Sequence, residues 1–381
     1  MFKTFQMELA GRPLIIETGK MAKQANGAVL VRYGDTVVLV ATTASKEPRE
    51  GTDFFPLTVD YEEKMYAVGK MPGGFLRREG RPGNSAILNA RLIDRPIRPL
   101  FDKRCRNDVH VVATVLSVDF DNAPELCGML GASASIGISD IPWDGPIAGV
   151  RIGRVDGKYV VNPTQEQLAE SSMNITVAGS EEAIMMVEGG ANEAPEEEVL
   201  DAIMFGHETI KELCRFQKKI IEEVGKPKRT MVFPEVPEEI DEAVAAYATE
   251  DLKKAIFDAD KLRRDGNIDA VKKAAKEHFA DIYPENGADV AESLDHLTKQ
   301  IVRDSISNEG IRPDGRKLTE IRPITCEVGL LPRVHGSALF TRGQTQALSI
   351  TTLAPMSETQ IIDDLTPITE KRYIHQYNFP S

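Results

Sequence analysis

The sequence predicts an α+β protein in which a β-rich module occurs twice, with a helical segment between the two copies. Three observations predict this class. Short apolar and β-branched runs dominate residues 2–67, residues 238–307 show helical patterns with no clear strand, and the pattern of residues 26–43 returns at residues 335–352. Strands and helices segregated in this way bury their apolar faces in packed layers, so a layered α+β fold is expected.

Composition narrows the class of protein further. The 381 residues suffice for two or three domains, and the net charge of −13 argues against general coating of nucleic acid, so any nucleic acid must be bound at a focused site. No apolar run approaches the roughly 20 residues of a membrane span, and the first residues lack the apolar core of a signal peptide. The cysteines form no CxxC pair and the histidines no HxxxH or HExxH spacing, which favours a cytosolic protein with reduced thiols and no histidine-built metal site.

The first part of the chain predicts a sheet and a covering helix. Residues 28–32 and 36–43 are apolar runs on either side of Tyr33-Gly34-Asp35, the pattern of a β-hairpin. Further strands are expected at residues 57–65 and 109–118. A helix is expected at residues 123–137, where small residues would allow close approach to a sheet: Gly128, Gly131, Ala132 and Ala134.

A smaller unit follows the first sheet. Residues 147–151 and 158–161 flank Asp156-Gly157, a hairpin signal, and two more strands are expected at 173–178 and 183–188. Residues 195–224 predict a long helix with Pro195 and acidic residues in its first turn, as the helix dipole favours. We therefore predict a first core at residues 1–145 and its C-terminal subdomain at 146–225.

A proline-bearing linker at residues 226–237 leads into the helical segment. Helices are expected at 238–264, 270–282 and 288–306, interrupted by Asp265-Gly266-Asn267 and by Pro284-Glu285-Asn286-Gly287. This pattern predicts an all-helical domain at 238–308. Residues 312–381 then begin the second copy, in which Gly336 and Gly343 align without gaps with Gly27 and Gly34. The second copy is expected to be incomplete, because Ser381 falls where the counterpart of residues 57–101 would start.

Arginine is concentrated between Gly73 and Phe101. This stretch carries six arginines, no lysine and two acids, so its charge is +4 while the remainder of the chain carries −17. Arginine rather than lysine suggests forked recognition of phosphate. Glycines on both sides of Phe75, Arg77 and Arg78 predict a mobile loop, and Arg81 follows it. An apolar ring beside guanidinium groups is the combination that binds single-stranded nucleic acid.

The second part of the arginine stretch predicts a helix that starts near Asn84 or Ser85, both good caps. At helical spacing one side holds Ala86, Ala90, Ile93 and Ile97, and the opposite side holds Arg91, Arg95 and Arg98. Proline at 96 and 99 is expected to end or kink the helix. The alternative interpretation is a solvated helix face behind a surface loop, although such faces normally mix signs and use lysine.

Long motifs carry a resemblance to a known family. GGFLRREGRP and RLIDRPIRPLF, together with RPDGR at residues 312–316 and HGSALFTRGQTQAL at 335–348, resemble the bacterial polynucleotide phosphorylases, or polyribonucleotide nucleotidyltransferases. The resemblance covers the entire chain. It implies an RNase PH-like βαβα core, a small all-helical domain and a truncated second RNase PH-like core.

The resemblance also implies an activity and assigns residues. Members degrade RNA from its 3′ end with inorganic phosphate as nucleophile, release nucleoside diphosphates, use Mg²⁺ and form ring-shaped homotrimers. Phe75, Leu76, Arg77 and Arg78 match the loop that constricts the central channel, where the family often has two aromatic residues and this chain has Phe-Leu, so weaker base stacking is expected. Arg91 and Arg95 match arginines that face the active site and hold the phosphate-bearing end of RNA. Single-stranded RNA and an RNA-degradation assembly are the expected partners, in the cytoplasm and not at a membrane.

The family's catalytic residues do not map onto this chain. Its acidic pair, which binds the metal, and its paired serines, which hold phosphate, would lie beyond Ser381, and Asp363-Asp364 lies too early, so a solvated turn is expected there. The 381 residues alone are therefore expected not to phosphorolyse RNA. The alternative is a non-catalytic RNase PH-like subunit that binds RNA within a ring.

Overall fold

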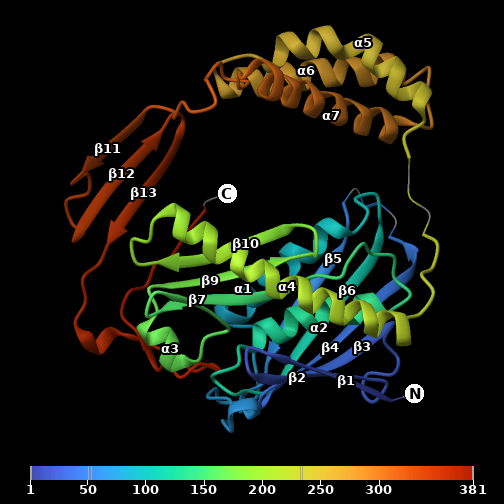
Figure 1. The fold of residues 1–381 in the computed structure, drawn as a ribbon. Coiled ribbons are helices and arrows are strands. Elements are labelled where there is room, and N and C mark those ends of the chain that lie inside the picture. Colours follow the sequence, from blue (N-terminus) through green and yellow to red (C-terminus); the bar gives the residue numbers. More distant parts are fainter. Residues whose placement is uncertain (1, 50, 53, 232, 234, 380–381) are drawn as a thin grey trace. The chain divides into compact units, whose positions relative to one another are not determined.

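The computed structural model describes residues 2–49, 51–52, 54–231, 233 and 235–379. Contacts divide the chain into two compact units, Met1–Phe233 with Thr359–Ser381 and Pro234–Glu358. Figure 1 traces the chain through both. Each unit has a hydrophobic cluster of its own. None of the helices in the described ranges combines the length and apolar character that a membrane crossing requires.

A six-stranded sheet forms the base of the first unit, in the order β1-β2-β3-β4-β6-β5. All neighbours are antiparallel except β5 and β6, which are parallel. Its strands are β1 (Lys3–Leu9), β2 (Arg12–Thr18), β3 (Gly27–Tyr33), β4 (Thr36–Pro48), β5 (Leu57–Glu63) and β6 (Asn107–Ser117). The expected β3–β4 hairpin is confirmed, because Tyr33 pairs with Thr36 across Gly34, whose φ is +57°.

Helix α2 (Pro124–Ile138) covers this sheet and is buried from Leu126 to its end. Its small residues make the close approach possible. A Cβ on Gly131 would lie 2.5 Å from Cγ2 of Val40 in β4. The hydroxyl groups of α2 are also satisfied in the core, since Ser135 shares a hydrogen bond of 2.6 Å with Thr42. The expected small-residue helix is therefore confirmed, and its spacing determines how tightly helix and sheet pack.

A four-stranded antiparallel sheet follows, in the order β10-β9-β7-β8. Its strands are β7 (Ala148–Val155), β8 (Lys158–Val161), β9 (Met173–Gly179) and β10 (Ile184–Ala191). The hairpin at Asp156-Gly157 is confirmed, with positive φ at both residues. The short helix α3 (Gln165–Glu170) was not predicted, although Thr164 and Gln167 form the capping box that a sequence reading could have detected.

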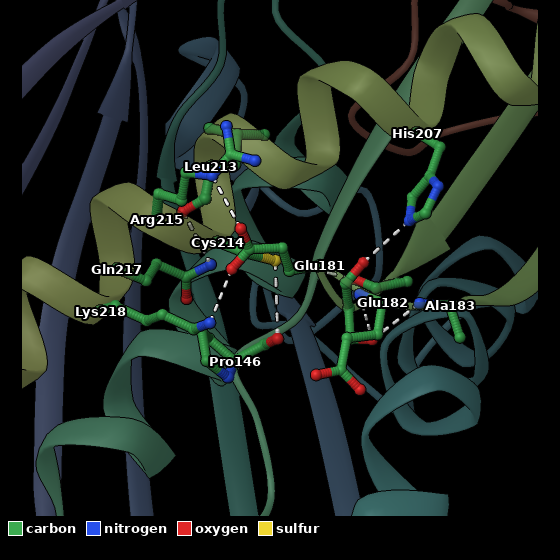
Figure 2. Close-up of polar contacts among 12 residues, drawn as sticks. Pro146, Glu181, Glu182, Ala183, His207, Leu213, Cys214, Arg215, Gln217 and Lys218 are labelled. Carbon is green, nitrogen blue, oxygen red and sulfur yellow. Dashed lines mark hydrogen bonds and ion pairs between the residues drawn. The ribbon is translucent and has the colours of Figure 1, made fainter.

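The long helix α4 (Glu196–Val224) packs on β7 and β9 and is held there by polar contacts as well as by its apolar side. Figure 2 shows these contacts. Arg215 and Lys218 both bind the carboxylate of Glu181, at 2.7 and 2.6 Å. The buried amide of Gln217 donates to the carbonyl oxygen of Ile147 at 2.8 Å. Ile147 lies just before β7 and Glu181 lies between β9 and β10, so these contacts fix α4 to that end of the four-stranded sheet.

The segment after α4 is not a free linker along its whole length. Lys228 Nζ lies within 2.8–3.1 Å of the carbonyl oxygens of Ile136, Gly137 and Ser139 at the end of α2. The backbone N–H of Arg229 donates to the carbonyl oxygen of Asp140 at 2.8 Å. A cation at the carboxyl end of a helix satisfies carbonyl groups that have no helical partner. Residues 226–229 therefore belong structurally to the first core.

The second unit begins with three helices, α5 (Glu238–Ile256), α6 (Lys261–Phe279) and α7 (Gly287–Asp304). The predicted break at Asp265-Gly266-Asn267 was wrong, because these residues lie inside α6. Asp260 instead caps α6 by accepting from the N–H of Arg263 at 2.9 Å. A glycine within a helix costs only about 1 kcal/mol, and an N-cap of this kind contributes a similar amount. The described part of residues 238–304 contains no strand.

A three-stranded sheet completes the second unit, formed by β11 (Ile324–Val328), β12 (Gly336–Arg342) and β13 (Thr345–Thr351). The predicted repeat is visible in its register. Gly336 pairs with Thr351 as Gly27 pairs with Thr42. Gly343 has a φ of +62°, close to that of Gly34. The repeat is therefore a repeat of backbone structure as well as of sequence.

Candidate nucleic-acid interface

The loop between the 3₁₀ helix Met65–Val68 and α1 (Asn84–Ile97) presents three large apolar side chains to solvent, those of Met71, Phe75 and Leu76. Phe75 is 101 % exposed and Leu76 is 83 % exposed. Single exposed apolar residues are common on proteins, but two consecutive ones that contact no core are poised for a partner. The loop therefore offers one aromatic face and one aliphatic face side by side.

The three arginines of this loop, Arg77, Arg78 and Arg81, are all exposed. Arg77 has a φ of +50° and its N–H donates to Gly74 O at 2.9 Å, so Phe75 and Leu76 lie at the centre of a tight turn. A residue other than glycine with a left-handed backbone is strained, and such residues occur often at functional sites. Within the described ranges, the guanidinium groups of Arg78 and Arg81 have no hydrogen-bond or ion-pair partner.

Helix α1 begins at Asn84, where the sequence predicted it, but its N-cap residue is Gly83 and no side chain caps it. The expected capping by Asn84 or Ser85 is therefore wrong. Its apolar side is confirmed, since Ala86, Ile93 and Ile97 are buried. Pro96 lies in the last turn, as expected, and a 3₁₀ turn (Arg98–Leu100) follows.

The three arginines on the opposite side of α1 have different surroundings. Arg91 is exposed, and its guanidinium has no partner in the described part of the chain. Arg95 forms an ion pair with Glu188 of β10, and its Nε donates to Arg91 O at 3.3 Å. Arg98 donates through Nε and Nη2 to the carboxylate of Asp94, at 2.9 and 2.6 Å. Arg91 can therefore bind an anion directly, Arg95 is held by one ion pair, and Arg98 is held by several contacts within the protein.

Arg98 also joins α1 to the sheet. Its Nη2 donates to the carbonyl oxygen of Leu57 at 3.0 Å, at the start of β5, and its side chain is 42 % exposed. Its Nη1 also donates to the carbonyl oxygen of Phe55 at 3.4 Å, so four hydrogen bonds within the protein leave this guanidinium little capacity for an anion. Glu188 was not found by sequence reasoning, and no sequence signal could have revealed it, because it lies 93 positions from Arg95.

Acidic groups near the loop do not assemble into a metal site. Asp363 is exposed, and Asp364 accepts hydrogen bonds from both the N–H and the hydroxyl of Thr366, at 2.8 and 2.6 Å. This is the turn that the sequence predicted. Among the described residues, no three His, Cys, Asp or Glu side chains are grouped to hold a metal ion. The residues present therefore do not fit a magnesium site, and no chemical step is derived through one.

Comparison with known families covers most of the chain. The family described as "3' exoribonuclease family, domain 1" matches residues 10–142 and again 320–381, which agrees with the internal repeat. Its "domain 2" matches residues 145–209. The family described as "Polyribonucleotide nucleotidyltransferase, RNA binding domain" matches residues 239–317, the helical segment.

Curated relatives match from end to end of this chain. Polyribonucleotide nucleotidyltransferase of Heliobacterium modesticaldum is 57 % identical over 378 residues, covering 99 % of this chain and 53 % of the relative. That of Syntrophomonas wolfei is also 57 % identical, covering 99 % of this chain and 54 % of the relative. A crystal structure of rice Rrp46 matches with a TM-score of 0.44 at 14 % identity, over 58 % of this chain and 94 % of that one. The chain spans about half the length of the curated relatives it matches.

Proposed function

The chain belongs to the 3' exoribonuclease family, and from this membership and its similarity to polyribonucleotide nucleotidyltransferases we propose that the protein is a phosphate-dependent 3′-to-5′ exoribonuclease. It removes nucleotides from single-stranded RNA by attack of inorganic phosphate and releases nucleoside diphosphates. The cellular role that follows is mRNA degradation and RNA processing. These statements concern the whole protein, of which the structure describes the two units above.

The exposed loop carries the part of this proposal that belongs to the present residues. Phe75 and Leu76 offer flat and aliphatic surfaces to bases, and Arg77, Arg78 and Arg81 surround them with uncompensated positive charge. Stacking on an aromatic side chain contributes about 1–3 kcal/mol per base and tolerates any sequence. In a chain with a net charge of −13, this local concentration of positive charge attracts an anion.

Helix α1 supplies a second contact. Arg91 is free to bind a phosphate group, and Arg95 can do so once its ion pair with Glu188 opens. Forked guanidinium groups bind phosphate oxygens in pairs, and they would balance the repulsion between inorganic phosphate and the RNA phosphodiester. Arg98 contributes by holding α1 on β5 rather than by contact with RNA.

The remaining features of the proposal rest on the family resemblance. We propose Mg²⁺ as the metal of the whole protein, a homotrimer as its assembly and the cytoplasm as its location, with other RNA-degrading proteins as partners. The first measurement is the release of nucleoside diphosphates from single-stranded RNA by the full-length protein, with and without inorganic phosphate. Binding of RNA without phosphate-dependent release would indicate a non-catalytic RNA-binding subunit and contradict the enzymatic proposal.

A salt titration tests the loop itself. Arg77→Ala with Arg78→Ala should weaken binding of a labelled single-stranded oligonucleotide and flatten its dependence on salt. Each phosphate contact that forms releases counterions, so binding with fewer contacts releases fewer of them. Two contacts correspond to a slope smaller by about 1.4 on logarithmic axes. Fluorescence anisotropy at several salt concentrations measures both quantities.

The matched control is Lys20→Ala with Lys23→Ala, which removes the same charge from the exposed turn between β2 and β3. The control should weaken binding slightly without changing the slope by a comparable amount. Equal slopes for the loop variant and the unmodified protein would remove the loop from the RNA path.

A further inference from the structure

The second unit contains a pocket of about 310 Å³ that nothing above has used. It lies between residues 312–322 and the turn that joins β12 to β13. Its volume is at the lower end of the range for small-molecule sites. Four arginines line it, together with a threonine, a glutamate and two apolar residues: Arg312, Arg316, Arg322, Arg342, Thr319, Glu320, Leu318 and Ile321.

Two of these arginines are positioned by the same acceptor. Arg312 Nη1 and Arg316 Nη1 both donate to the carbonyl oxygen of Glu320, at 3.0 and 2.9 Å. Arg316 also donates through Nε to Asp314 at 2.8 Å and is only 17 % exposed. Their guanidinium groups are therefore fixed before any ligand arrives, which lowers the entropy cost of binding.

The third and fourth arginines close the other side of the pocket. Arg322 Nε lies 3.6 Å from the same Asp314 carboxylate, and its side chain packs over Gly343 in the β12–β13 turn. The N–H of Gly343 donates to Pro323 O at 2.9 Å, which holds that turn against the wall of the pocket. Arg342 is the last residue of β12, and within the described ranges its guanidinium has neither a hydrogen bond nor an ion pair.

The charges around the pocket do not balance. Four guanidinium groups face two carboxylates, and one of these, Asp314, is already shared by Arg316 and Arg322. The other, Glu320, accepts from the backbone N–H of Lys317 at 3.2 Å. The cluster therefore has two more positive than negative charges in a concave site, where field lines concentrate and attract an anion.

We propose that this pocket binds the phosphate groups of a small ligand, either inorganic phosphate or a nucleoside diphosphate. Four guanidinium groups that line one pocket suit a tetrahedral oxyanion, and Thr319 adds a hydroxyl donor. Leu318 and Ile321 are 51 % and 71 % exposed at the rim, so an apolar surface is available to a base. A pocket of this volume holds one small molecule. The inference rests on this pocket alone and does not depend on the RNA-binding loop.

Isothermal titration calorimetry of the 381-residue chain tests the proposal with three probes: inorganic phosphate, adenosine diphosphate and a short single-stranded RNA. Arg342→Gln is the diagnostic variant, because this side chain holds no other part of the protein. It should weaken binding of the small probe about tenfold, as expected for the loss of one charge-assisted contact. Arg342→Lys keeps the charge but not the forked guanidinium, so its affinity should lie between those of the unmodified chain and Arg342→Gln.

Arg333→Gln is the matched control, since Arg333 is exposed in the loop at the opposite end of the β11–β12 hairpin and carries the same charge. It should bind the small probes as the unmodified chain does. Circular dichroism and thermal unfolding establish that all three variants are folded. Binding of phosphate alone would identify inorganic phosphate as the ligand, and much tighter binding of the diphosphate would identify a nucleotide.

Three results would overturn the proposal. One is the absence of phosphate and diphosphate binding at millimolar concentrations. Another is binding that Arg342→Gln leaves unchanged, which would place the anion elsewhere. The third is an equal loss of RNA and small-ligand binding in this variant, which would make the surface a contact for polymers.

Discussion

Glu188 forms an ion pair with the guanidinium group of Arg95, the group that we propose binds an RNA phosphate. We predict that Glu188→Gln in the full-length protein tightens binding of single-stranded RNA about two- to fivefold, because an exposed ion pair contributes less than about 1 kcal/mol. Anisotropy with a labelled oligonucleotide measures the change. The control is Glu193→Gln, which removes the same charge just beyond β10. Equal gains for both variants would show a general effect of charge and not release of Arg95.

Asp102 provides a pH-dependent contribution to stability. Hydrogen bonds from the side chain and the backbone of Arg104 lower the pKa of Asp102 to about 2. Because the folded pKa lies below the usual value of about 3.9, the stabilisation is present above pH 4 and is lost as the pH falls toward 2.

We predict that Asp102→Asn lowers the free energy of unfolding by at most about 1 kcal/mol at pH 7, since solvent screens this partly exposed pair. The difference should vanish near pH 2. Urea denaturation at pH 7, 4 and 2.5 measures it, with the exposed Asp201→Asn as control. A difference that persists unchanged at pH 2.5 would show that Asp102 acts through its shape and not through its charge.

At the scale of elements, the two copies of the repeat differ in what packs against the start of their equivalent strands, β3 in the first copy and β12 in the second. A Cβ on Gly27 would lie 2.0 Å from the backbone oxygen of Ser135 in α2, whereas one on Gly336 would meet Thr351 at an ordinary 3.4 Å. We predict that Gly27→Ala destabilises the first unit by about 2 kcal/mol or more, because a backbone atom cannot move aside as a side chain can.

Gly336→Ala is the matched control, at the equivalent position of the other copy. It should be neutral or slightly stabilising, since alanine loses less backbone entropy than glycine in a strand. Thermal unfolding of both variants checks the pair. Similar losses of stability would mean that intrinsic strand preference, and not the contact with α2, decides the outcome.

The elements that the sequence predicted well are those whose signals are local. The turns at Gly34 and Asp156-Gly157 require positive φ and carry residues that allow it, so both hairpins were predicted in the right place. The break between α5 and α6 was misplaced at Gly266, because α6 begins earlier, where Asp260 accepts from the backbone N–H of Arg263 and Asp258 accepts from its side chain. The glycine and the capping carboxylate are both visible in the local sequence, and the hydrogen bond of the cap determines where α6 begins.

The candidate site was predictable only in part, for a different reason. The exposure of Arg77, Arg78 and Arg91 agrees with the spacing of the sequence. The engagement of Arg98 by β5 and of Arg95 by β10 depends on tertiary contacts that no local pattern encodes. Helical periodicity shows which side chains share a face, and it does not show which of them already have partners.

At the scale of the whole molecule, the chain contains two separate hydrophobic cores. The core of the helical segment is formed within residues 236–302, by residues of α5, α6 and α7 with those that flank them. A segment of this size whose buried residues contact one another can fold alone, with a modest stability of about 3–5 kcal/mol. The segment also matches a single family, at residues 239–317.

We therefore predict that residues 235–311, produced alone, form a helical protein that unfolds cooperatively. Leu252 is fully buried in α5, and Leu252→Ala should remove about 2–5 kcal/mol, enough to abolish the cooperative transition. Leu262→Ala in α6 removes the same atoms from a side chain that is 78 % exposed and should change little. Circular dichroism during thermal unfolding measures all three proteins. Weak helicity in the unmodified fragment, or equal effects of the two substitutions, would show that the helices depend on the rest of the chain for their core.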